Sequence, residues 1–212
     1  MKTFLPLICI WLTIVSSNLF SQNVSKISPV NLEGRHSIYL FAGMKINSSS
    51  SANATLTAAK SEVNAQFGIG YRYWFMNEWA VNASIGFFGA ETDLNYSKVE
   101  SITIIPILFG FNYFPQALAL GSVGRAFIGI NMGAYMGNAT KNSFSFNSLG
   151  SGSVSETVFG IEPNAGIDFI VSDWLRIGPS LSYHFISDFK EVIGNKKNYS
   201  GPIFSINIGL LL

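Results

Sequence analysis

The chain alternates apolar and polar residues with a period of two over much of its length. Residues 63–75, for example, place Phe67 and Ile69 on one face and Gln66 and Arg72 on the other. Successive side chains of a strand point to opposite faces, so this period predicts strands rather than helices. Eight segments share the pattern: Ile38–Ile46, Val63–Phe75, Trp79–Gly89, Ile105–Tyr113, Ala126–Met136, Phe159–Val171, Leu175–Phe185 and Pro202–Leu212.

Each of the eight segments carries one apolar face, whereas the opposite face consists largely of glycines and polar side chains. A soluble carrier barrel would place its apolar side chains inside, so this pattern favours a barrel whose outer face meets lipid. After residue 21, no run of the sequence approaches the roughly 20 apolar residues that a membrane-spanning helix needs. The sequence therefore predicts an all-β fold, an eight-stranded antiparallel up-and-down transmembrane β-barrel.

The connections between the predicted strands alternate in length, as expected for hairpins that cross a membrane. On one side lie the three-residue turns Met76–Glu78 and Ser172–Trp174 and the longer connection Pro115–Gly124. On the other side, four longer segments are predicted to be loops: Ser48–Ala59, Thr92–Glu100, Lys141–Ser155 and Phe189–Tyr199. The serine-rich ones among them are expected to be flexible and solvated.

Aromatic residues gather beside the short turns. Trp74, Trp79 and Trp174 flank the two three-residue turns, and Tyr113 and Phe114 precede the third connection. Amphipathic aromatic rings are enriched at membrane–water interfaces, so these five residues predict an interfacial girdle at the short-turn side.

Composition and charge narrow the class further. Only 12% of the 212 residues are charged and 48% are hydrophobic, which argues against both a water-facing surface and a disordered chain. The 13 basic residues are spread among 12 acidic ones and form no stripe, so we expect no nucleic-acid partner. The one cysteine, Cys9, lies in the first apolar stretch, which excludes a disulfide framework.

The first residues have the features of a secretory signal. Lys2 supplies the positive charge, Phe4–Val15 the apolar run and Ser16–Ser21 the small polar exit. We expect three parts: a cleaved signal peptide at 1–21, a short periplasmic segment at 22–34, and the barrel domain at 35–212.

Ionisable side chains at inward strand positions are predicted to form a polar network in the barrel interior. A buried charge without a partner costs several kcal/mol, so these groups should pair with one another. If Val171 faces Leu175 across the turn, Glu162 lies opposite His184, and Asp168 lies diagonal to Arg176. Arg72, on another strand, can join either carboxylate across the barrel. The predicted network therefore contains Arg72, Glu162, Asp168, Arg176 and His184; its role is expected to be structural, with a gate as the alternative.

Some stretches resemble a known family. Ile105–Phe114 resembles the fourth strand of small eight-stranded outer-membrane barrels, and Asn164–Phe169 with Trp174–Gly178 resembles their sixth and seventh strands. The resemblance covers about Arg35 to Leu212 and implies an OmpA/OmpX-like or PorT-like barrel in the bacterial outer membrane. It implies two partners, outer-membrane lipid and the barrel-assembly machinery. Such chains usually end in an aromatic residue, whereas here Leu212 occupies that lipid-facing position.

Candidate chemistry is sparse. The sequence has two histidines, His36 and His184, which lack both a compact serine motif and metal-ligand spacing. No catalytic, cofactor-binding or metal site is therefore predicted. The leading hypothesis is a non-enzymatic outer-membrane barrel with a structural, adhesive or interaction role, and an extracellular or envelope protein ligand at loops 48–59 and 141–155. The alternatives are a lipid-modifying enzyme (lipid A deacylase or acyltransferase type), a small channel and a soluble lipocalin-like carrier.

Overall fold

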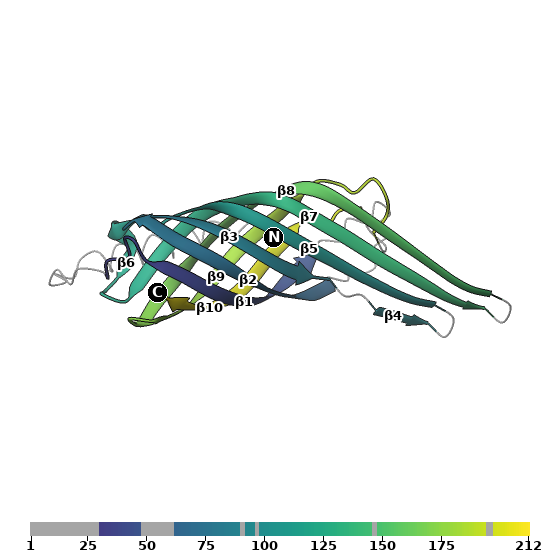
Figure 1. Cartoon of the computed structure of the whole chain (residues 1–212), viewed down its shortest axis with the longest axis horizontal. Helices are drawn as coiled ribbons and strands as arrows, with labels where there is room; N and C mark the ends of the chain where they lie inside the picture. The colour runs from purple at the N-terminus through teal and green to yellow at the C-terminus, as the bar shows by residue number, and fades with distance from the viewer. Residues whose placement is uncertain (1–29, 48–61, 90–91, 96–97, 146–147, 194–196) are drawn as a thin grey trace, which may run out of the picture.

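The computed structural model describes residues 30–47, 62–89, 92–95, 98–145, 148–193 and 197–212, which form one antiparallel sheet closed into a barrel (Figure 1). The long strands are β1 (His36–Asn47), β2 (Glu62–Met76), β3 (Trp79–Phe88), β5 (Lys98–Tyr113), β7 (Gly124–Ser145), β8 (Ser148–Ser172), β9 (Leu175–Ile186) and β10 (Gly201–Leu211). The short elements are β4 (Thr92–Asn95), the 3-10 turn η1 (Gln116–Leu118) and β6 (Ala119–Leu120). The expected signal peptide and the loop at 48–59 lie outside the described residues.

Each of the eight long strands pairs with the next one along the chain, so that β5 pairs with β3 on one side and with β7 on the other. The ring closes where the first long strand, β1, pairs with the last, β10. At the end of this seam, the backbone N–H of His36 donates to the carbonyl of Leu212 at 3.1 Å, and the backbone N–H of Leu212 donates to the carbonyl of His36 at 2.9 Å. Every predicted strand is present in this ring, so the predicted fold class is confirmed. Among the described residues, no helix is long and apolar enough to cross a membrane.

The apolar faces of the strands lie on the outside of the barrel. On β1, Leu40 is 63% exposed, whereas the adjacent Tyr39 is 7% exposed. The same alternation runs along β10, whose residues change between buried and exposed at every position from Ile203 to Leu211. The outer face is therefore apolar and the interior polar, as the period of two predicts.

Strands β7 and β8 extend far beyond their predicted ends. The segment Lys141–Ser155 is predicted to be a loop, but its described residues, 141–145 and 148–155, belong to the paired strands β7 and β8, in which Lys141 pairs with Gly152. The described residues of Thr92–Glu100 likewise form β4 and the start of β5, which pair with each other. Serine, glycine and asparagine are typical of loops, so the composition of residues 141–155 does not indicate a strand. The strand forms because its backbone groups are hydrogen bonded to the neighbouring strand. Figure 1 shows β5, β7 and β8 projecting past the other long strands, with β4 beside the end of β5.

The turn between β8 and β9 differs from the predicted register by one residue. Leu175 pairs with Ser172 and not with Val171, because an irregularity lies between Ile170 and Ser172. The shift ends within the turn, since Ile170 pairs with Arg176 and Asn164 with Ser182. A bulge of this kind bends the strand at its end and leaves the interior register as predicted.

Buried apolar side chains form a cluster at each end of the barrel. The turn-end plug contains Leu32, Trp74, Ala80, Phe114, Phe127, Ile170 and Leu211. The hairpin-end plug contains Phe88, Ile102, Ile104, Leu108, Tyr135, Ala139, Ile186, Phe189, Ile193 and Tyr199.

Two of the five residues expected in the interfacial girdle, Trp74 and Phe114, are fully buried in the turn-end plug, so that part of the prediction is wrong. Trp79 and Trp174 are exposed as expected. Trp74 has inward parity, which places it inside the ring rather than against lipid.

Candidate functional site: the barrel interior

Asp168 lies between two arginines near the turn-end plug. Its two carboxylate oxygens contact Arg72 Nη1 at 2.6 Å and Arg176 Nη1 at 2.8 Å, and all three side chains are buried. β8 and β9 bring Asp168 and Arg176 together as diagonal neighbours, whereas Arg72 reaches Asp168 from β2 across the interior. Arg176 Nε also donates to the hydroxyl of Ser37 at 2.8 Å.

Aromatic rings surround the two arginines. The guanidinium of Arg72 lies 5.0 Å from the centroid of the Phe127 ring and 5.6 Å from that of Trp74. The guanidinium of Arg176 lies 4.8 Å from the centroid of the Tyr39 ring. Such cation–π contacts stabilise a desolvated cation, so the turn-end plug and the arginine pair support each other.

Glu162 and His184 form a second group, closer to the hairpin-end plug. His184 Nε2 lies 2.5 Å from Glu162 Oε2, and the imidazole packs edge-on against the rings of Phe88 and Tyr135. Asn131 Nδ2 donates to the other oxygen of Glu162 at 3.0 Å. The five sequence-predicted residues are thus divided into two groups, and no hydrogen bond or ion pair joins these groups among the described side chains.

A chain of asparagines extends from Glu162, and sequence reasoning did not single it out. Ionised Glu162 can only accept, so Asn131 must turn its NH₂ group toward Glu162 and its oxygen toward Asn82. Asn82 Nδ2 donates to that oxygen at 2.8 Å. Asn112 and Asn164 form a similar pair at 2.8 Å. Inward parity was the signal available in the sequence, but it does not reveal which inward residues meet across the ring.

The polar groups line a small internal cavity of about 60 Å³, with Gln66, Asn82 and Asn112 among its walls. The side-chain oxygens of these three residues are buried and have no protein partner. A buried water needs about 10–15 Å³ of such space, so the cavity has room for about four waters beside these oxygens. Apart from this small cavity, side chains fill the described interior between the two plugs.

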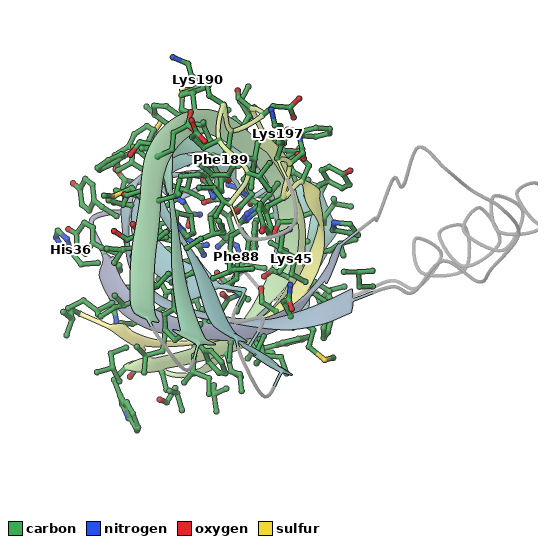
Figure 2. All side chains as sticks on the ribbon, turned by 90° about the vertical axis from the view of Figure 1, so that its right-hand side faces the viewer. His36, Lys45, Phe88, Phe189, Lys190 and Lys197 are labelled. Carbon is green, nitrogen blue, oxygen red and sulfur yellow. The ribbon has the colours of Figure 1, made fainter. Side chains whose placement is uncertain are left out.

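At the hairpin end, the connection between β9 and β10 folds into the mouth of the barrel. The side chains of Phe189 and Tyr199 are buried there, and the Lys45 ammonium donates to the carbonyl of Tyr199 while lying 4.7 Å from the Phe88 ring. Figure 2 shows Lys45, Phe88 and Phe189 inside the mouth, with Lys190 at the rim. Phe189–Tyr199 is predicted to be one of the longer loops, and the apolar side chains of its described residues Phe189, Ile193 and Tyr199 close the opening.

A carboxylate fastens this connection to β8. Glu156 accepts hydrogen bonds from the backbone N–H groups of Lys190 and Glu191, at 3.0 Å each. These two hydrogen bonds, the one from Lys190 first, lower the pKa of Glu156 below its ordinary value. The ionised form of Glu156 is therefore the one that holds the connection in place.

At the turn end, the residues before β1 fold under the barrel. Arg125 Nη1 donates to the carbonyl of Val30 at 2.7 Å, and Arg125 Nη2 donates to the carbonyl of Asn77 at 2.7 Å. The N–H of Leu32 donates to Asn77 Oδ1 at 3.1 Å, which fixes the fully buried Leu32 side chain in the turn-end plug. The end of the segment 22–34 is thus part of the closure of the barrel.

No family model matches the sequence, and no curated protein sequence matches it. Solved structures do match. The crystal structure of Ail, the attachment invasion locus protein of Yersinia pestis, covers 85% of this chain and 99% of its own, with a TM-score of 0.54 and 17% identity. The chain has the fold of a small outer-membrane barrel. OprG, an outer membrane protein from Pseudomonas aeruginosa, matches this barrel with a TM-score of 0.53 and 13% identity, over 86% of this chain and 97% of its own.

A second structure of Ail contains a bound ligand. Ail in complex with the heparin analogue sucrose octasulfate matches this barrel at a TM-score of 0.54 and 16% identity, over 85% of this chain and 99% of its own. At these identities the likeness shows the fold alone.

The two histidines lie in different settings. His184 is fully buried against Glu162, whereas His36 is exposed on the outside of the barrel (Figure 2), where its Nδ1 contacts the hydroxyl of Tyr71 at 2.5 Å. Within the described part of the chain, neither imidazole is hydrogen bonded to a serine. Nor do the described residues contain a group of three or more potential metal ligands.

Proposed function

We propose that this protein is a non-enzymatic outer-membrane barrel that binds a partner protein through its protruding β7–β8 hairpin. We propose further that residues 1–21 are a cleaved export signal and that the barrel-assembly machinery inserts the barrel into lipid. The apolar outer face supports the membrane location, since Leu40, Phe109 and Leu181 are each about 60% exposed on three different strands. The fold shared with outer-membrane proteins supports it as well.

The observation that carries the partner proposal is a free strand edge. The pairing of β8 with β9 begins at Gly160, which faces Ile186, and runs from there toward the turn end. From Ser148 to Ser155, β8 pairs with β7 on one side, and none of the described strands pairs with its other side. From Glu156 to Phe159, the β9–β10 connection lies along that side, since Glu156 binds the N–H of Lys190 and the Phe159 carbonyl accepts from the N–H of Ser187. An open edge presents backbone N–H and C=O groups to which an extended partner segment can add as a further strand. The loop at 48–59, predicted to share the ligand, lies outside the described residues.

A shortened hairpin tests the proposal. Lys141 and Gly152 are paired across β7 and β8, so replacing residues 142–151 with an Asn-Gly turn shortens the hairpin without shifting its register. We expect the shortened protein to insert normally but to lose the partners that the intact protein cross-links in cell envelopes. A matched control shortens the β9–β10 connection by removing residues 194–196 and leaves the edge of β8 in place. Equal cross-linking by the intact and shortened hairpins would contradict the proposal.

The membrane location is tested separately. A closed barrel leaves no unpaired edge in the bilayer, so we expect the protein to need detergent and to migrate differently in SDS before and after boiling. Solubility in plain buffer would contradict the location.

The enzyme alternative is tested by chemistry. Lipid A incubated with the purified barrel should keep its mass, because the described residues give neither histidine a serine nucleophile. A loss or gain of an acyl chain that disappears in the His36→Ala variant would establish the lipid-modifying alternative instead.

A further inference from the structure

The outer face of the barrel has an apolar hollow of about 430 Å³ over β1, β2, β3 and β5. Ala83 lies at its centre, and the cross-strand partners of Ala83 are Tyr71 on β2 and Phe109 on β5. The next row of outward residues is Ile69, Ile85 and Ile107. Because every neighbour of Ala83 in these rows is large, its single methyl group leaves a depression that is open to the bilayer.

A polar cluster adjoins the hollow on the side of the short turns. Tyr71 lines the hollow, and its hydroxyl also contacts His36 Nδ1 at 2.5 Å. The His36 ring stacks on Tyr73, with 4.7 Å between the ring centroids. The contact with Tyr71 occupies one nitrogen of His36 and leaves Nε2 able to donate to another group. Histidine and tyrosine are the side chains here that can bind a phosphate oxygen at a membrane surface.

The aromatic residues nearby set the depth of this cluster. Trp79 and Tyr113, which pair across β3 and β5 with 4.7 Å between their ring centroids, lie at the strand ends beside the short turns. Such rings mark the boundary between lipid headgroups and acyl chains. His36 and Tyr73 are one strand row farther in than this boundary pair, and the Ala83 row is the next. The cluster therefore lies next to this boundary, within reach of a phosphate there, and the hollow lies one row deeper, among the acyl chains.

We propose that the hollow and the His36–Tyr71–Tyr73 cluster together bind one phospholipid from the leaflet at the turn end. One acyl chain fills the hollow over Ala83, and the phosphate accepts hydrogen bonds from His36 Nε2 and the Tyr73 hydroxyl. A phospholipid matches both halves of the site, whereas the same face of a second barrel would leave these polar groups without an acceptor. This inference rests on the membrane location proposed above.

The test is native mass spectrometry of the full barrel chain, released from detergent containing palmitoyl-oleoyl phosphatidylethanolamine. We expect one phospholipid to remain on each barrel at collision energies that remove the detergent. Ala83→Leu fills the hollow and should weaken retention about tenfold, because its added carbons displace acyl contacts. Ala165→Leu is the matched control, since Ala165 is an exposed outward alanine on β8, away from the site. It should retain lipid like the native chain.

The headgroup is tested with diacylglycerol of the same acyl chains and with the double variant His36→Ala, Tyr73→Phe. We expect the native barrel to retain phosphatidylethanolamine in preference to diacylglycerol, and the double variant to lose this preference. Equal retention by Ala83→Leu and the native chain, no preference for the phosphate, or a dimer without lipid would each overturn the site. A chain that stays soluble without detergent would overturn the membrane location and this site with it, whereas an inserted barrel without retained phospholipid would overturn the site alone.

Discussion

The two ends of the barrel are closed by different means. At the turn end, Leu32 packs among side chains of the strands, and the adjoining arginines share Asp168. At the hairpin end, the connection between β9 and β10 enters the mouth and is fastened by Lys45 and Glu156. One closure belongs largely to the strands and the other to an inserted connection, so the first should open only when the barrel unfolds and the second can open while the barrel stays intact.

The ion groups beneath the two plugs also differ. At the turn end, Asp168 contacts the guanidinium groups of two arginines, Arg72 and Arg176. At the hairpin end, Glu162 contacts one imidazole, that of His184, and one amide, that of Asn131. The carboxylate at the turn end is thus held by two cationic side chains, whereas the one at the hairpin end is held by fewer and weaker partners.

The largest effect is expected at the turn end. Arg176→Ala should lower the free energy of unfolding by about 3–5 kcal/mol, because it leaves a buried Asp168 with one partner in place of two. Adding Asp168→Asn should recover part of this loss. The measurement is urea unfolding of the barrel in lipid vesicles, followed by tryptophan fluorescence. Strictly additive losses would show that Arg176 and Asp168 do not interact.

A smaller loss is expected at the hairpin end. His184→Leu should cost about 1–3 kcal/mol, since Glu162 loses one partner but keeps the hydrogen bond from Asn131. The same unfolding measurement compares it directly with Arg176→Ala. If His184→Leu proved the more damaging change, the turn end would no longer be the more rigid closure.

The fastening by Glu156 should depend on pH. Its pKa is lowered in the folded protein, so its contribution is complete above the ordinary value of 4.5 and is lost as the pH falls through the lowered value. The protection of the Lys190 and Glu191 amides against hydrogen exchange, measured relative to their intrinsic rates at each pH, should therefore fall in acid, with the strands unaffected. Glu156→Gln, which keeps the shape of the side chain, should remove most of this pH dependence; an unchanged profile in that variant would refute the fastening.

The smallest effect concerns ion flow. With both plugs closed and only a small cavity between them, the native barrel should show almost no conductance in planar bilayers. Removing residues 188–198 opens the hairpin end alone, so the turn-end plug should still keep the conductance low. Stable large openings in the native barrel would favour the channel alternative.

The sequence predicts the parts of the strands that face lipid well, and it predicts the parts of β7 and β8 that extend beyond the membrane poorly. Outward and inward residues must alternate wherever lipid lies on one side, which made β9 and β10 recognisable from their pattern. Beyond the membrane no such constraint acts, so the ends of β7 and β8 have the composition of a loop although Lys141 to Ser145 pairs residue by residue with Ser148 to Gly152. The bulge at Val171 likewise leaves no mark in the pattern.

The interior was predictable only in part. Short turns transmit register, so the placement of Asp168 near Arg176 and of Glu162 near His184 could be inferred from sequence. The contact between Asn82 and Asn131 could not, because it joins strands far apart in sequence and depends on how the ring closes. The insertion of the β9–β10 connection, with Lys45 against Tyr199, is of the same kind.

The mutual hydrogen bonds of His36 and Leu212 bear on the order of events during assembly. They join the first and last strands of the ring, so the seam between β1 and β10 is the contact of greatest sequence separation. Contacts of this kind are slow to form because a long stretch of chain must be organised first. Until β10 arrives, β1 and β9 each have an open edge that can pair with other chains. The docking of the last strand of the ring thus ends this period of vulnerability, and its speed sets how long the unfinished barrel is at risk of aggregation.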